Sequence, residues 1–287
     1  MYYDFEKDFK LTLAILFFVA FAGKVPTFPF HIWLPEAHVE APTSGSVILA
    51  SILLKLGSYG FLRFYIPLFF DISSILWPYI CLLTGFSCVY CSLIAIQQTD
   101  LKKIIAYSSI AHMNLGVLGI FSGSLFGLHG GLLLFISHGL ISGGLFFCVG
   151  ILYDRYHTRS LFYYSGLAQC MPLFSSVFMF FMFSNTAFPG SSGFVAEFLT
   201  LLGVFLEDRE LSFVVGGATI ILTLVYSITA ATRVCFGPIR IVYFRYFIDL
   251  TYREFLVLSP LMFFIIYIGF SADFVLDYTY LSLLFLY

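Results

Sequence analysis

The stretch SGSVILASILLKLGSYGFLRFY, residues 44–65, decides the class of fold. Its apolar residues run without the polar alternation of a barrel strand, and about 20 such residues let one helix cross a bilayer. Similar stretches recur, so that 60% of the 287 residues are hydrophobic and 10% are charged. In soluble domains about 45–50% of the residues are hydrophobic and about 25% are charged. We therefore predict an all-α, polytopic membrane helix bundle.

The remaining bulk properties exclude several other classes of protein. The net charge is −2 and the mean hydropathy is +0.98. Such a chain is not expected to be disordered, collagenous or a disulfide scaffold, and no nucleic acid is expected as a partner. Phospholipids are the expected surroundings.

Eight apolar segments are predicted to cross the membrane. The connections between them are short, so residues 1–287 are interpreted as a single membrane domain without a soluble module. The predicted spans cover residues 11–34, 44–65, 75–97, 104–122, 126–152, 172–206, 212–236 and 255–272.

Lysine and arginine are unevenly distributed between the two sides of this bundle. With the N-terminus on side one, four basic residues fall on side one and eight on side two, while Lys24 and Lys55 lie within spans. Loops on the cytoplasmic or matrix side carry such an excess. Side two is therefore predicted to face cytoplasm or matrix, with both termini opposite. The side-two residues are Lys102, Lys103, Arg155, Arg159, Arg233, Arg240, Arg245 and Arg253.

Two of the spans are predicted to be broken helices. The first contains GKVPTFPFHIWLP (23–35) and the sixth contains SNTAFPGSSGFVAEF (184–198). Proline removes a helical hydrogen bond and glycine lets the backbone deviate further. Such prolines could simply kink the helices. Paired breaks at corresponding places, however, indicate a transporter core built from repeats.

A few ionisable side chains lie at bilayer depth and are candidates for function. A charge there costs roughly 2.5–3.5 kcal/mol on insertion scales, and burial favours the neutral form of lysine and glutamate. Such groups can therefore gain and lose protons. They are Lys24, Lys55, His112, His138 and Glu197, on five different spans. His31, seven residues after Lys24, is a further candidate for the same cavity.

Metal and redox sites are weaker interpretations. Cys88 and Cys91 form a C-x-x-C within an apolar run, which favours small buried residues. Glu36, His38 and Glu40 could bind a metal, but prolines bracket them and a polar loop or channel mouth is favoured. The sequence has no flavin fingerprint and no cysteine cluster for iron–sulfur ligation, so no cofactor is expected in this chain.

Several runs resemble a known family. GKVPTFPFHIWLPEAHVEAPTSGSVILASILLKLGSYGFLRF (23–64) is similar to the proton-channel signature of the subunit 4 family of respiratory complex I, NADH:ubiquinone oxidoreductase. QQTDLKKIIAYSSIAHMNLG (97–116), ISHGLISGGLFFCVGILYDRYHTR (136–159) and FPGSSGFVAEF (188–198) extend the resemblance over roughly residues 15–240. The wider group includes other antiporter-like subunits and cation/proton antiporters.

The resemblance implies a role for each candidate residue. Lys24 matches the central lysine on a broken helix, the family's seventh of fourteen, and Lys55 matches the bridging lysine on the next helix. His112 and His138 match relay histidines, and Glu197 matches the acidic residue on the second broken helix. The expected path carries a proton along the membrane midplane between two half-channels.

The resemblance also implies missing helices. Residues 11–65 would supply two helices of the first inverted repeat, residues 75–236 the complete second repeat, and 255–272 the terminal helix. The first six helices, with the glutamate that pairs with the lysine at Lys24, have no counterpart. We expect a split or truncated form, with a second chain supplying those helices and a carboxylate near Lys24.

The expected function is proton translocation in the membrane arm of complex I, together with its other membrane subunits. The resemblance implies the mitochondrial inner membrane, with both termini toward the intermembrane space. One alternative is a subunit of a cation/proton antiporter or membrane-bound hydrogenase. Another is a structural remnant of the membrane arm that does not pump protons.

Overall fold

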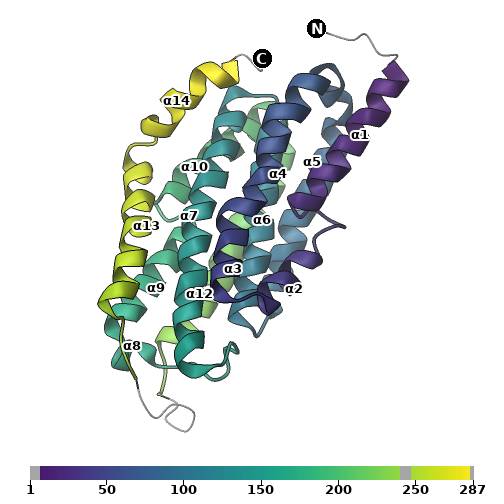
Figure 1. Cartoon of the computed structure of the whole chain (residues 1–287). Helices are drawn as coiled ribbons and strands as arrows, with labels where there is room; N and C mark the ends of the chain where they lie inside the picture. The colour runs from purple at the N-terminus through teal and green to yellow at the C-terminus, as the bar shows by residue number, and fades with distance from the viewer. Residues whose placement is uncertain (1–6, 240–246, 285–287) are drawn as a thin grey trace.

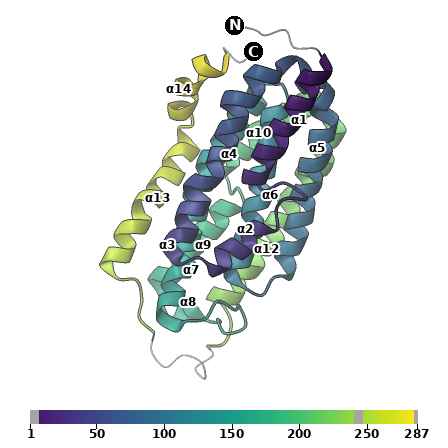
Figure 2. The same ribbon diagram turned by 45° about the vertical axis from the view of Figure 1, so that its right-hand side comes forward.

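The computed structural model describes residues 7–239 and 247–284, so that Arg240 and Arg245 lie outside the described residues. The described chain is an elongated bundle of helices (Figures 1 and 2). The start of α1 and the end of α14 lie at the same end of this bundle. Their placement agrees with an even number of crossings.

The helices follow one another with short connections, and η marks π-helical turns. In chain order they are α1 (Lys7–Lys24), α2 (Trp33–Glu40), α3 (Thr43–Ile48), η1 (Leu49–Leu53), α4 (Leu54–Gly60), η2 (Phe61–Tyr65), α5 (Ile66–Gln97), α6 (Leu101–Phe121), α7 (Leu125–Tyr156), α8 (Leu167–Cys170), α9 (Pro172–Asn185), α10 (Ser192–Glu207), α11 (Arg209–Leu211), η3 (Ser212–Gly216), α12 (Gly217–Cys235), α13 (Tyr252–Phe270) and α14 (Asp273–Leu284).

Within the described residues, six helical stretches are long and apolar enough to cross a membrane. They correspond to the six predicted spans without a break. The predicted helical membrane bundle is therefore confirmed. The stretches are Thr43–Ser73, Ile75–Gln97, Leu101–Phe121, Leu125–Tyr156, Arg209–Cys235 and Tyr252–Phe270.

The other two predicted spans are interrupted, as the prolines and glycines indicated. α1 ends at Lys24 and α2 begins at Trp33, while α9 ends at Asn185 and α10 begins at Ser192. In the second break Gly190 has φ of 94°, a conformation that glycine adopts without steric cost. Both breaks fall in the middle of the bundle (Figure 1).

α6 is the central helix of the bundle. Nearly all of its residues are buried. In α13, by contrast, only 17% of the most apolar stretch is buried. α6 packs along α5 and α7, and α10 packs along α7. Because α6 is enclosed on all sides, polar groups on it must find partners within the protein.

Several contacts at the side-two end fix the long helices. Arg155, near the end of α7, pairs with Glu254 of α13 at 2.5 Å. Glu254 also completes a capping box with Thr251, so the start of α13 is fixed on both sides. Lys102, at the start of α6, donates to the carbonyl of Ala41 at 2.8 Å.

Two predictions about local structure were wrong or incomplete. Residues 36–40 were predicted as a loop, but they form the last turns of α2. Pro35 does not prevent this helix, because the amides of a first turn have no acceptor within the helix. α14, at residues 273–284, was not predicted at all, and it packs against α7.

Candidate functional site

Four of the predicted residues meet inside the bundle, each from a different helix. Lys55 of α4 reaches His138 of α7, with 2.9 Å between Nζ and Nδ1. The rings of His138 and His112 of α6 lie 5.8 Å apart. His112 Nδ1 lies 3.0 Å from Glu197 Oε1 of α10. We call this set, Lys55, His138, His112 and Glu197, the polar row.

Lys55 is directed inward by the turn that precedes it. The π-helical turn η1 ends two residues before Lys55, and such turns are frequent at functional sites. Lys55 Nζ donates to the carbonyl of Ala50 at 2.5 Å. An ammonium group has no lone pair, so the His138 Nδ1 beside a charged Lys55 must be unprotonated. The proton of His138 then lies on Nε2.

Glu197 and His112 form a buried pair. Their side chains are 9% and 6% exposed, and the His112 ring nitrogen on the other side, Nε2, lies 3.5 Å from the hydroxyl of Tyr226. The imidazole therefore has polar groups at both nitrogens. A proton accepted at Nε2 can be balanced by release of the Nδ1 proton to the carboxylate.

A small cavity lies between the Lys55–His138 pair and the His112–Glu197 pair of the polar row. His112, His138 and Glu197 line it together with polar side chains of α7 and α9, namely Ser137, Ser184 and Asn185. Its volume is about 10 Å³. This is close to the space that one ordered water molecule needs, and the lining offers several hydrogen-bonding groups.

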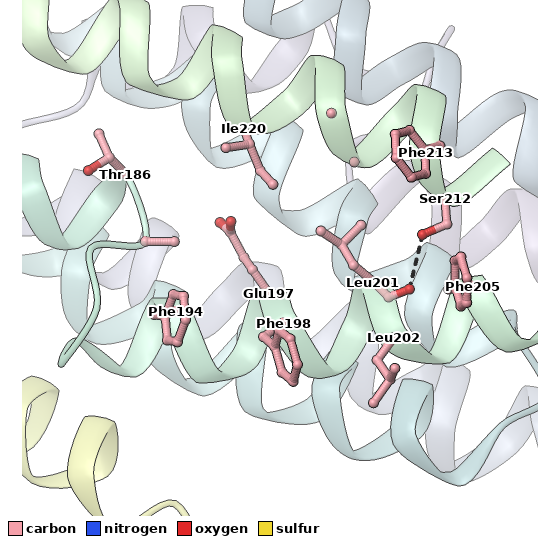
Figure 3. Close-up of a pocket in the computed structure, with 13 residues that line it drawn as sticks. Thr186, Phe194, Glu197, Phe198, Leu201, Leu202, Phe205, Ser212, Phe213 and Ile220 are labelled. Carbon is pink, nitrogen blue, oxygen red and sulfur yellow. Dashed lines mark hydrogen bonds between the residues drawn. The ribbon is translucent and has the colours of Figure 1, made fainter. Parts of the chain in front are cut away.

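Glu197 also borders a larger groove on the outside of the bundle. The groove measures about 450 Å³ and lies between α10 and the start of α12. In Figure 3 the carboxylate of Glu197 points toward Ile220, and Phe194 and Phe198 of the same helix line the groove beside it. Apart from the carboxylate and hydroxyls such as that of Ser212, the lining is apolar. Glu197 thus lies between the polar row and this groove.

Lys24 lies apart from the polar row. It is the last residue of α1 and is exposed, and in the part of the chain that the structure describes it forms no ion pair. Its backbone is nevertheless close to α4, since a Cβ added at Gly57 would lie 3.1 Å from Lys24 Cβ. Lys24 is therefore next to the helix of Lys55, and no described residue supplies it with a counter-charge.

His31 is not joined to the polar row by any contact among the described residues. Its ring is 4% exposed and stacks on Phe28 in the first break at a centroid distance of 5.8 Å. Tyr90 of α5 meets it edge-on at 5.7 Å. Lys24 therefore precedes the first break and is exposed, whereas His31 lies within the break and is buried against α5.

His38 occupies an unexpected position. It is fully buried and stacks on Phe146 of α7 at 4.4 Å. Neither ring nitrogen has a hydrogen-bond partner within residues 7–239 and 247–284. No group of three or more metal-binding side chains occurs within those same residues, so the structure does not unite Glu36, His38 and Glu40 as a metal site.

Two polar contributors, Tyr226 and Asn185, were missed by the sequence analysis. Tyr226 is buried on α12 against His112, and Asn185 ends α9 at the wall of the small cavity. Both stand among apolar and hydroxyl residues of transmembrane segments, where tyrosine and asparagine are unremarkable. Asparagine directly before the predicted second break was the one available signal.

Comparisons with known proteins identify similar chains. The profile of the family described as NADH:quinone oxidoreductase/Mrp antiporter, TM, matches residues 5–223. NADH-ubiquinone oxidoreductase chain 4 of Chondrus crispus is 49% identical over 93% of this chain and 54% of its own length. NADH-quinone oxidoreductase subunit M of Rhodobacter capsulatus is 44% identical over 92% and 52%.

A solved structure shows the same fold. A chain of respiratory complex I from Thermus thermophilus with bound NADH superposes with a TM-score of 0.87 at 30% identity, over 95% of this chain and 57% of that one. The chain spans about half the length of the curated relatives it matches.

Proposed function

Since this chain belongs to the NADH:quinone oxidoreductase/Mrp antiporter family, we propose that it relays protons in the membrane arm of respiratory complex I, as a subunit 4 type protein. The observation that carries this proposal is the polar row, in which a lysine, two histidines and a glutamate from four helices follow one another. The similarity to chain 4 and subunit M proteins supports the assignment.

The proposed path begins at Lys55. Its ammonium gives a proton to Nδ1 of His138 across 2.9 Å, leaving a neutral amine and an imidazolium. The Nε2 proton of His138 then passes toward His112 through the small cavity, which has room for about one bridging water. His112 passes a proton from Nδ1 to Glu197 across 3.0 Å, which restores neutral imidazoles and leaves a protonated carboxyl.

The surroundings of the polar row fit this role. Packed helices hold the Lys55–His138 and His112–Glu197 pairs at 2.9 and 3.0 Å, within the short range that direct proton transfer requires. Glu197 also borders the groove between α10 and α12, so the last member of the row lies next to the outside of the bundle. We propose that electron transfer belongs to other subunits and that no cofactor binds this chain.

The proposed setting follows from the relatives. We infer the mitochondrial inner membrane, with side two toward the matrix and both termini toward the intermembrane space. The partners would be other membrane subunits of complex I and phospholipids. We further propose that a carboxylate outside the described residues lies near Lys24, on helices that correspond to the part of the relatives that this chain does not match.

Substitution of Lys55 by alanine tests the proposal. In the assembled complex reconstituted in vesicles, K55A should lower proton pumping and coupled quinone reduction by roughly tenfold or more, because the row loses its first proton carrier. Assembly should persist, since alanine favours helix and buries no charge. Lys103→Ala at the side-two end of α6 is the control and should pump normally.

The alternatives predict different results. If K55A assembles and pumps like the parent complex, Lys55 is no essential carrier and the chain fills the membrane arm without pumping. Purification of this chain without a quinone-reducing arm would instead favour a cation/proton antiporter or a membrane-bound hydrogenase.

A further inference from the structure

The first break, residues 25–32, exposes backbone carbonyls in the interior of a membrane bundle. Such groups must be satisfied by the protein, because the surrounding lipid offers no hydrogen bonds. Two neighbouring helices supply partners. The amide of Phe28 donates to Ser87 Oγ of α5 at 2.9 Å, and the carbonyl of Pro26 accepts from Asn114 Nδ2 of α6 at 2.9 Å.

Asn114 is suited to hold this break. It is fully buried, and its Nδ2 donates both to Pro26 and, at 2.8 Å, to the carbonyl of Ile110 in its own helix. Both partners are carbonyls, which only accept hydrogen bonds, so the orientation of the side-chain amide is fixed. Both hydrogens of the amide are therefore used, one within α6 and one across to the break.

The position of Asn114 relates the break to the polar row. Pro26 is two residues after Lys24, and Asn114 is two residues after His112. Two residues along an α-helix turn the side chains by about 200°, so Asn114 and His112 project from opposite sides of α6. One side of this helix thus binds the break next to Lys24, and the other side binds Glu197 of the second broken helix.

We propose that Asn114 is a positioning residue for proton transfer: it holds the break that carries Lys24 on the same helix that carries His112. This inference rests on the proposed function for its effect on pumping, but the contact itself does not depend on it. Without the Asn114 hydrogen bond, the segment after Lys24 has one anchor fewer, and Lys24 shifts relative to Lys55 and the polar row.

Asn114→Leu, which keeps a similar volume and removes both donors, is the direct test. In the assembled complex, deuterium exchange of the amides in 25–32 should become roughly tenfold faster, because loss of a buried partner favours local opening. Proton pumping per NADH oxidised should fall by roughly twofold or more as Lys24 loses its position. Ser109→Ala is the matched control, since buried Ser109 donates only within α6, to Ile105 at 2.9 Å.

Asn114→Asp adds a readout that a packing role would not change. A protonated carboxyl has one hydrogen to donate to Pro26, whereas an ionised one has none and repels the carbonyl. In N114D, deuterium exchange of the amides in residues 25–32, taken relative to the parent complex at the same pH, should therefore become faster as the pH rises. Proton pumping should fall over the same pH range. This variant also decides the matter if N114L does not assemble.

Any one of three results would overturn the inference: unchanged amide exchange in residues 25–32 for N114L, unchanged exchange there for N114D at every pH, or the same acceleration in S109A. The exchange measurements can be told apart from a failure of the proposed proton relay. Normal pumping by K55A would refute the relay, while the exchange data would still show whether Asn114 holds the break.

Discussion

Glu197 illustrates how a charge is tolerated at bilayer depth. Its carboxylate is 9% exposed, and its partner His112 is equally enclosed and faces Tyr226 on its other side. Burial of an unpaired carboxylate would cost several kcal/mol. Pairing with an imidazole lowers this cost, and it also provides a group that can exchange a proton with the carboxylate.

Glu197→Gln should therefore stop the relay without disturbing the fold. Glutamine keeps the size and can still hydrogen-bond to His112, but it cannot take up the proton. In the assembled complex we expect proton pumping to fall by roughly tenfold or more. Glu207→Gln, at the exposed end of the same helix, is the control and should pump normally. Equal pumping by the two variants would contradict the role of Glu197.

Most of the polar row could be predicted from residue types, because ionisable side chains are rare in apolar segments and therefore conspicuous. Lys55, His138, His112 and Glu197 do meet in the structure, although their role in proton transfer stays a prediction. Tyr226, Asn114 and the burial of His38 could not be predicted, because they depend on which helix faces which. A single sequence does not contain that information.

At the scale of helices, proline and glycine predicted both breaks, since proline removes a helical hydrogen bond and glycine lets the backbone deviate. The hydrogen-bond partners of the backbone in the first break could not be predicted in this way. Ser87, Asn114 and Trp33, whose indole donates to the carbonyl of Gly23 at 3.1 Å, belong to other segments. α14 escaped prediction because its mixed apolar and polar sequence has no strong period.

The contact between α1 and α4 depends on a glycine, which allows a test at this scale. A Cβ at Gly57 would lie 2.6 Å from Val25 Cγ2 and 3.0 Å from the Val25 amide. Gly57→Ala should push α4 off the first break and destabilise the fold by about 1–3 kcal/mol. At Gly23, near the end of α1, a Cβ meets nothing within 4 Å, so Gly23→Ala should be neutral or stabilise by about 0.5–1 kcal/mol.

Thermal denaturation of the assembled complex measures this difference. The midpoint temperature of denaturation should fall in G57A and should stay the same or rise in G23A. A G57A complex as stable as its parent would mean that α1 and α4 can separate freely, and the close approach would then have no bearing on the position of Lys24.

At the scale of the molecule, α1, η1 and α4 leave both a charge and apolar side chains exposed. Lys24 is exposed at the end of α1, and so are Leu16, Ile52 and Tyr59. An exposed lysine so far from the ends of its span would be costly against lipid. A neighbouring segment outside the described residues, bearing a counter-charge, would shield Lys24 from lipid.

We therefore expect a carboxylate from outside the described residues within about 4–6 Å of Lys24, near enough to favour the charged lysine. Within the described residues no acidic group pairs with Lys24: Asp71 binds Lys10 at 2.9 Å and Glu197 binds His112 at 3.0 Å. Such a pair would act as a switch, because its separation removes the counter-charge and lets Lys24 give its proton toward Lys55. A structure of the whole complex should show further helices packed against residues 11–65, with a carboxylate at the depth of Lys24. Lipid alone there, or a single accessory helix, would refute the pumping role and favour the structural remnant.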